Sequence, residues 1–238
     1  MITVPGLLVT SGKGGVGKTL LSANLAIELS RYVRVALVDA DIRAPNLSYV
    51  MGLRKYGREF ANRKLIPYHH SDTLEIFSTD HFLAVNGKKR AIMPTGEEVR
   101  AIVQQSITAV AWNNPDIFVM DSDPSTGDVF FAVRDVFGPM LSAVVVTTND
   151  VSSLFDCERT IDALMINDIN IMSVVGNMIF DGDDGGVRAL CSRFDLKYAG
   201  YIPFDSAVRK KNNAGDPGMS GSEIITQIVG NILHRRSV

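Results

Sequence analysis

The sequence has few cysteines, no long apolar run and little net charge. None of its apolar runs approaches the ~20 residues needed to span a bilayer, and the apolar start, Ile2 to Val9, lacks the basic region of a secretory signal. The two cysteines, Cys157 and Cys191, are far apart, and neither belongs to a C-x-x-C. These absences exclude a disulfide scaffold and favour a cytoplasmic protein in a reducing compartment.

The charge and composition are those of an ordinary soluble protein. A formal net charge of −2 gives no electrostatic reason to expect general nucleic-acid binding. Hydrophobic residues make up 46% and charged residues 21% of the chain, as in globular proteins. No linker or repeat divides the 238 residues, so we expect one domain over residues 1–238.

Short apolar runs alternate with helical stretches along the chain. This pattern predicts an α/β fold, a doubly wound, mainly parallel sheet with helices on both faces and a ligand at the carboxyl ends of the strands. We expect Arg54–Ser71 to form an exposed, irregular segment between the second and third strands. The predicted strands are Gly6–Thr10, Val33–Asp39, Leu74–Ser78, Asp116–Asp121, Ala143–Thr148, Ser173–Met178 and Tyr198–Pro203, and the predicted helices are Lys18–Ser30, Gly96–Trp112, Ser152–Met165, Gly185–Phe194 and Ser222–Arg235.

A glycine-rich loop follows the first strand and opens the first helix. Its glycines let the backbone turn tightly and aim N–H groups at phosphates, and the helix N-terminus favours anions. In this G-x-x-x-x-G-K-[ST] pattern, Lys18 would neutralise the β- and γ-phosphates and the Thr19 hydroxyl would ligate Mg²⁺. The residues expected to bind the nucleotide are Gly14, Gly15, Val16, Gly17, Lys18, Thr19 and Leu20.

A second loop lysine, Lys13, repels Lys18 unless a polyanion lies between or beside them. With it, the loop resembles the deviant Walker A ATPases of the MinD, ParA and Mrp type, whose pattern is K-G-G-x-G-K-[ST]. The resemblance implies an ATPase that forms a nucleotide-sandwich homodimer, in which Lys13 reaches the partner's nucleotide. The alternative is that Lys13 only supplies local positive charge.

Acidic residues end two of the predicted strands. Asp39 and Asp41 resemble the family's first switch, D-x-D, which implies that Asp41 orients or activates the attacking water and that Asp39 supports the Mg²⁺ shell. Either acid could instead cap the next turn or helix. Asp121 follows four apolar residues, the Walker B pattern that holds Mg²⁺ through a water.

The segment after Asp121 resembles the second switch of the Mrp subfamily, D-L-P-P-G-T-G-D. Here Asp123 replaces a proline and Ser125 replaces a glycine, which bears on the turnover rate more than on nucleotide binding. By the same resemblance, Asn177 recognises the adenine edge and the segment containing Pro203 flanks the base. A lone asparagine at a strand end is otherwise a turn residue.

The resemblance covers almost the whole chain and is closest to the Mrp-like group. Mrp-like proteins use a C-x-x-C, soon after the equivalent of Asn177, to carry iron–sulfur clusters, and this sequence has no cysteine there. We therefore do not expect a stable iron–sulfur cluster. Asp181, Asp183 and Asp184, and separately the His69-His70 pair, are interpreted as solvated loops rather than as metal sites.

The last predicted helix carries an apolar stripe followed by basic residues. MinD-like proteins attach such a helix to membranes, whereas packing on the sheet explains the stripe equally well. Because the stripe has no aromatic residue and only two arginines follow it, packing on the sheet is the favoured interpretation and membrane association stays the alternative. The main hypothesis is a Mg²⁺–ATP-hydrolysing homodimer that acts on an unknown protein client. A MinD/ParA-type positioning ATPase and a nucleotide-sensing scaffold with negligible turnover remain the alternatives.

Overall fold

A mainly parallel sheet runs through the computed structural model, which describes residues 2–53, 60–61, 64–79, 84–85, 88–89, 94–124, 127–218 and 222–236. The strands of this sheet are β1 (Gly6–Thr10), β2 (Val35–Asp39), β5 (Tyr68–Ser71), β6 (Leu74–Ser78), β9 (Ile117–Asp121), β10 (Leu141–Thr147), β11 (Asn170–Ile179) and β12 (Tyr198–Pro203). Two antiparallel pairs lie outside the sheet, β3 (Phe60–Ala61) with β4 (Lys64–Leu65), and β7 (Ala84–Val85) with β8 (Lys88–Lys89).

The strand order is β12-β11-β10-β1-β9-β2-β6-β5, and every neighbouring pair is parallel except β5 and β6. The central strand, β1, lies between β10 and β9, so the chain winds outward in both directions from it. This confirms the predicted doubly wound α/β fold. The central strands are apolar and buried along their whole length, as expected for a sheet that is covered on both faces.

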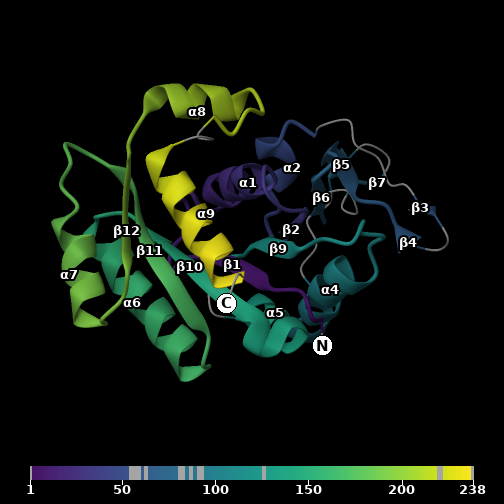
Figure 1. Ribbon diagram of the computed structural model, residues 1–238, viewed down its shortest axis with the longest axis horizontal. Coiled ribbons are helices and arrows are strands. Elements are labelled where there is room, and N and C mark those ends of the chain that lie inside the picture. Colours follow the sequence, from purple (N-terminus) through teal and green to yellow (C-terminus); the bar gives the residue numbers. More distant parts are fainter. Residues whose placement is uncertain are drawn as a thin grey trace.

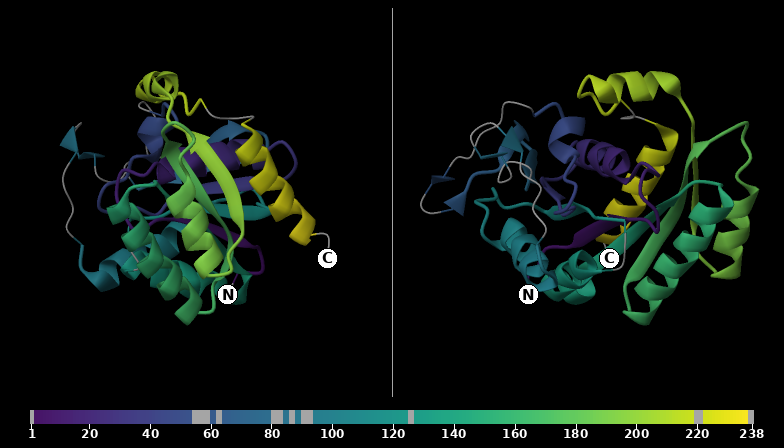
Figure 2. Two further views of the ribbon diagram at one scale, coloured as in Figure 1. Left: turned by 90° about the vertical axis from the view of Figure 1, so that its left-hand side faces the viewer. Right: turned by 180° about the vertical axis from the view of Figure 1, so that it is seen from behind.

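Helices cover both faces of the sheet (Figures 1 and 2). They are α1 (Lys18–Leu29), α2 (Leu47–Val50), α4 (Gly96–Thr108), α5 (Asp128–Phe137), α6 (Val151–Ile166), α7 (Gly185–Arg193), α8 (Ser206–Asn213) and α9 (Glu223–Arg236). One core cluster joins the sheet to α1, α2 and α9, and a second joins it to α4, α5, α6 and α7. A 3-10 turn at Gly138–Met140 leads from α5 into β10.

Several elements differ from the sequence prediction, and the short helix α2, helix α8 and the two antiparallel pairs are among those that were not predicted. Helix α5 was not predicted, although six of its ten residues are buried in the second core cluster. Tyr68–Ser71, predicted as part of an exposed, irregular segment, adds an antiparallel edge strand to the sheet. Helix α4 ends at Thr108 rather than at Trp112, whose ring packs edge-on against Phe77 and Phe118.

The C-terminal helix packs on the sheet through its apolar stripe. Ile225, Ile228, Val229 and Ile232 are buried in the first core cluster. The packing alternative therefore accounts for this stripe, because its apolar side chains are already covered. No helix in the described part of the chain is long and apolar enough to cross a bilayer.

Candidate nucleotide site

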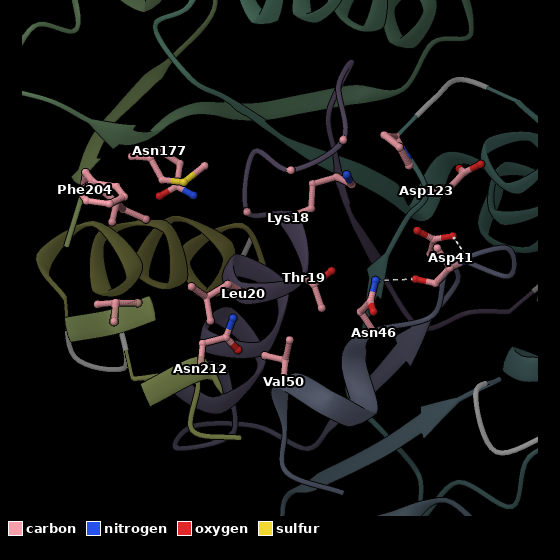
Figure 3. Close-up of a pocket in the computed structure, with 18 of the residues that line it drawn as sticks. Lys18, Thr19, Leu20, Asp41, Asn46, Val50, Asp123, Asn177, Phe204 and Asn212 are labelled. Carbon is pink, nitrogen blue, oxygen red and sulfur yellow. Dashed lines mark hydrogen bonds between the residues drawn. The ribbon is translucent and has the colours of Figure 1, made fainter. Parts of the chain in front are cut away.

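A cavity of about 760 Å³ opens at the carboxyl ends of the sheet strands. Figure 3 shows Asp41 and Asp123 on one side of it, Asn177 and Phe204 on the opposite side, and Lys18 between them. One end of the cavity is therefore charged, and the other carries an amide and an aromatic ring. This distribution suits an elongated ligand with a polyanionic end and a flat end.

The glycine-rich loop forms the charged end. Gly15 and Gly17 have φ angles of +82° and +94°, in the left-handed region that glycine adopts without strain. Gly17 has no side chain with which to cap α1, so the first N–H groups of that helix remain available to anions. The side chain of Val16, in contrast, is buried in the core, so any contact from Val16 to a nucleotide is through its backbone.

Lys18 is buried at the base of this loop, with only 7% of its surface exposed. Burial lowers the pKa of its ammonium group, and nearby carboxylates oppose that change; in order of strength these belong to Asp121, Asp41 and Asp123. One buried cation therefore lies among several acids. A Mg²⁺–polyphosphate complex would bring both the anions that Lys18 attracts and the cation that the acids attract.

Asp121 is the most enclosed acid that bears on Lys18. Burial raises its pKa to about 6, while the Thr19 hydroxyl, Lys18 and Ser22 lower it; Ser22 Oγ donates to Asp121 Oδ1 over 3.1 Å. The contact between Thr19 and Asp121 joins the two residues that the sequence assigns to Mg²⁺. Mg²⁺ usually keeps several waters and uses few protein oxygens beside substrate phosphates, so this pair fits such a shell.

Asp39 lies next to Asp121 in the register of β2 and β9 but does not line the cavity. Its Oδ2 accepts hydrogen bonds from Ser78 Oγ at 2.8 Å and from the Leu47 N–H at 3.1 Å. Burial, with the charge of Asp121, raises its pKa well above the ordinary range. Asp39 thus anchors the start of α2, the capping role left open above, and its place in the Mg²⁺ shell stays a prediction.

Asp41 lines the cavity at the end of the same strand. It is half-buried, and its Oδ1 accepts a hydrogen bond from the Ala44 N–H over 2.9 Å. This bond shapes the loop that follows β2 and leaves the carboxylate at the charged end of the cavity. The structure therefore places Asp41 beside Lys18 and Thr19 and close enough to the buried Asp121 to affect its pKa, and its role toward the attacking water stays a prediction.

Lys13 does not line the cavity of its own chain. Its Nζ donates to Ser152 Oγ, at the start of α6, over 2.8 Å. The neighbouring Gly12 packs so tightly on this helix that an added Cβ would lie 2.1 Å from the Asp156 carbonyl oxygen. Helix α6 thus fixes the first half of the loop, with the Lys13 side chain exposed.

Asn177 and Pro203 both lie at the opposite end of the cavity. Asn177 Nδ2 donates to the Val16 carbonyl over 2.7 Å, and the same nitrogen would meet a Cβ at Gly17. The asparagine therefore supports the loop directly, a contact that the sequence did not reveal. Leu20, Phe204, Val208 and Asn212 also line the cavity, and the last two come from α8, which was not predicted.

The second switch is only partly described, because Ser125 and Thr126 lie outside the described residues. Asp123 lines the cavity and is buried, and Arg43 Nη1 lies 3.5 Å from its Oδ2. Arg43, which also lines the cavity, was not identified from the sequence. Its position, two residues after Asp41 in the same loop, is the signal that could have identified it.

Other predicted features lie away from this cavity. Cys157 and Cys191 are buried in one core cluster, and burial, with the charge of Cys191, raises the pKa of the Cys157 thiol to about 12. The helices that carry them, α6 and α7, pack against each other. Among the described residues, no group of three or more His, Cys, Asp or Glu side chains could hold a metal ion.

Two predicted loops are more ordered than expected. Asp184 is buried rather than solvated, because it accepts hydrogen bonds from Arg188 Nε at 2.8 Å and from the Tyr198 hydroxyl at 2.7 Å. Asp181 and Asp183 are exposed, as predicted. His69 lies on edge strand β5, where its Nδ1 is 2.9 Å from Glu75 Oε1.

The fold and the cavity together define a P-loop nucleotide-binding protein. Over residues 5–235, the chain matches the family described as ParA, NUBPL iron-transfer P-loop NTPase. The chain belongs to this family of P-loop NTPases, which confirms the relationship inferred from the loop.

Curated relatives have names that refer to iron–sulfur clusters. An iron-sulfur cluster carrier protein of Deinococcus radiodurans is 33% identical over 227 residues, which cover 90% of this chain and 63% of that protein. A cytosolic Fe-S cluster assembly factor NUBP1 homolog of Brugia malayi is 27% identical over 228 residues, which cover 88% of this chain and 73% of that protein. This chain therefore spans about two thirds of the length of such relatives.

Solved structures share the fold at lower sequence identity. The septum site-determining protein MinD of Pyrococcus horikoshii, complexed with Mg-ADP, superposes with a TM-score of 0.71 at 20% identity and covers 97% of this chain and 96% of its own. A nucleotide-binding protein of Archaeoglobus fulgidus in complex with ADP gives a TM-score of 0.70 at 22% identity, covering 89% of this chain and 86% of its own. These two likenesses establish the shared fold.

Proposed function

We propose that this chain is a Mg²⁺-dependent ATPase of the Mrp type, a single domain that acts as a nucleotide-switched homodimer. The observation that carries this proposal is that Lys18 and Thr19, which line the charged end of the cavity, both interact with the buried Asp121 behind them. Phosphoryl transfer asks the protein mainly for positioning and for stabilisation of charge. The glycine loop and Lys18 would hold the phosphates, and Thr19 and Asp121 would hold the Mg²⁺.

At the other end of the cavity, Asn177 and Pro203 are proposed to hold the base. The Asn177 amide has one N–H bound to Val16, which leaves its oxygen as an acceptor for an exocyclic amine such as that of adenine. Pro203 and the Phe204 ring provide apolar surface beside it. These contacts would orient the nucleotide along the cavity with its phosphates at the loop.

Asp41 is proposed to orient or activate the attacking water. We expect Asp41→Ala to bind ATP within about threefold of the wild type and to hydrolyse it at least about tenfold more slowly, because a residue that acts on the chemical step contributes little to ground-state affinity. Steady-state phosphate release and calorimetry measure the two quantities. Equal losses of binding and turnover would instead assign Asp41 a structural role.

The proposed homodimer is supported by the position of Lys13. Its side chain lies outside its own cavity and is exposed beside α6, so it is available to a second subunit. The nucleotide of one subunit would then hold both chains together. The protein client stays unidentified, and affinity capture with Asp41→Ala locked with ATP is the direct way to find it.

The names of the relatives suggest that the client is a metalloprotein under assembly. We propose that this chain serves it without a C-x-x-C cluster site of its own. Anaerobic reconstitution with iron and sulfide, followed by iron counting, tests this view. About four irons per dimer that are lost in Cys157→Ala or Cys191→Ala would restore a cluster-carrier function.

A further inference from the structure

Arg43 is a cation at the mouth of the phosphate end that has no role in the scheme above. It lies in the loop after β2, two residues beyond Asp41, and lines the same cavity as Lys18. Half of its side chain is exposed. An arginine at this position can rotate without breaking core packing, because its guanidinium group is not enclosed.

The partners of Arg43 come from the second switch and from α5. Its Nη1 lies 3.5 Å from Asp123 Oδ2, and its Nη2 lies 4.0 Å from Asp128 Oδ2. The two loops that flank the phosphate end are therefore joined across the cavity mouth by one guanidinium group. Asp128 has a second partner, since Arg100 Nε lies 3.6 Å from its Oδ1.

Asp123 and Asp128 differ in how much charge compensation they lose if Arg43 moves. The Asp128 side chain is 34% exposed and keeps Arg100 as a partner. The Asp123 side chain is only 8% exposed, and its charge lies close enough to Lys18 to raise the pKa of that lysine. A triphosphate whose β- and γ-phosphates sit at Lys18 would bring new negative charge beside Asp123. Like charges repel strongly at a site that is this enclosed.

We propose that Arg43 leaves Asp123 and contacts the terminal phosphate when a nucleoside triphosphate binds, so that it discriminates a triphosphate from a diphosphate. This inference rests on the proposed nucleotide site and assigns that site a further substrate-contacting residue. A guanidinium group matches phosphate oxygens bidentately, and such charge-assisted bonds are about twice as strong as neutral ones. The loss of the Arg43–Asp123 ion pair would change the contacts of both switches, the loop after β2 and the segment after β9, when a triphosphate is bound.

A matched pair of substitutions tests the proposal. Arg43 and Arg100 are both partly exposed, at 50% and 44%, and both pair with Asp128, but only Arg43 lines the cavity. We expect Arg43→Gln to weaken the binding of a non-hydrolysable ATP analogue at least about tenfold and that of ADP by no more than about threefold. Arg100→Gln should leave both affinities within about twofold of the wild type.

A third variant tests the role of Asp123 as the competing partner of Arg43. Asp123→Asn removes the charge that competes for Arg43, so it should tighten analogue binding relative to ADP, and part of that gain should vanish when Arg43→Gln is added. Calorimetry with Mg²⁺ gives all affinities, and thermal unfolding confirms that each variant is folded. If Arg43→Gln does not fold, Arg43→Lys and Asp123→Asn give the same comparison.

The outcomes separate the proposal from the nucleotide assignment beneath it. Wild-type protein that binds neither ADP nor the analogue would overturn the nucleotide site itself. If the wild type binds both ligands, two results would overturn only the role of Arg43. One is that Arg43→Gln loses as much affinity for ADP as for the analogue; the other is that Arg100→Gln loses the same affinities as Arg43→Gln. A loss confined to the analogue and to Arg43→Gln supports it.

Discussion

At the scale of single residues, the site is governed by acids that have been removed from water. Asp121 and Asp39 are fully buried side by side, and burial raises the pKa of both. Without a bound cation, Lys18 and the Thr19 and Ser22 hydroxyls stabilise the ionised form of Asp121. The Ser78 hydroxyl and the Leu47 N–H do the same for Asp39. A Mg²⁺ ion at this place would favour ionisation, which is why the pair suits a metal site that fills together with the nucleotide.

The raised pKa of Asp121 predicts a pH dependence of stability. A carboxyl group whose pKa is about 6 in the folded chain and 3.8 otherwise binds its proton more tightly when folded. Its contribution to stability is therefore present at low pH and is lost as the pH rises through about 6. We expect the nucleotide-free protein to lose about 1 kcal/mol from this group between pH 5 and pH 7.

Urea unfolding at the two pH values measures this loss, and Asp121→Asn is the control because an amide does not titrate. The change between pH 5 and pH 7 should be smaller in Asp121→Asn by about 1 kcal/mol. Identical pH profiles for the two proteins would show that Asp121 is ionised throughout, which would contradict the account of its burial.

At the scale of elements, the phosphate loop is held between two supports. Asn177, at the end of β11, donates to the Val16 carbonyl, and Gly12 packs on the backbone of α6 at Asp156. Neither support belongs to the loop motif. The shape of the loop thus depends on elements more than 130 residues away along the chain, as the 139-residue separation of Lys13 and Ser152 illustrates.

Gly12→Ala should separate the loop from α6. The added Cβ would lie 2.1 Å from the Asp156 carbonyl oxygen, so one of the two elements must move. We expect a loss of about 1–3 kcal/mol in the unfolding free energy of the nucleotide-free protein, typical of overpacking. Gly14→Ala is the matched control, since its nearest neighbour would be Pro124 Cγ at 3.8 Å, and equal losses in the two variants would count against this packing.

The sequence predicts those parts of the site that depend on local chemistry. The loop glycines, Lys18, Thr19 and the acids that end β2 and β9 follow from a strand, a tight turn and a helix in succession. Contacts between distant elements were not predictable, because the Asn177–Val16 bond and the Arg43–Asp123 pair depend on how loops from different strands meet. Helix α5 was missed because its apolar residues follow directly on the second switch, whose pattern suggested a loop.

At the scale of the whole molecule, the proposed ATPase needs two copies of the chain. Lys13 is exposed and bonded to Ser152 rather than directed into its own cavity. We expect Lys13→Ala to weaken ATP-dependent dimerisation while its monomer still binds ADP, because the lysine would act on the partner's nucleotide. Light scattering with ADP, with ATP and without nucleotide measures the mass, and a wild-type mass that never changes would count against a nucleotide-driven dimer.

The proposed function depends above all on Lys18 holding the phosphates of ATP, and calorimetric titration with Mg²⁺–ATP tests this role most directly. Because Lys18 is the buried cation beside Asp121, Asp41 and Asp123, its removal leaves the charge of these acids uncompensated where the phosphates would bind. We predict that the wild type binds Mg²⁺–ATP and that Lys18→Ala, shown to be folded by thermal unfolding, binds at least about 100-fold more weakly. Near-normal affinity in folded Lys18→Ala would contradict the assignment of this cavity to the nucleotide.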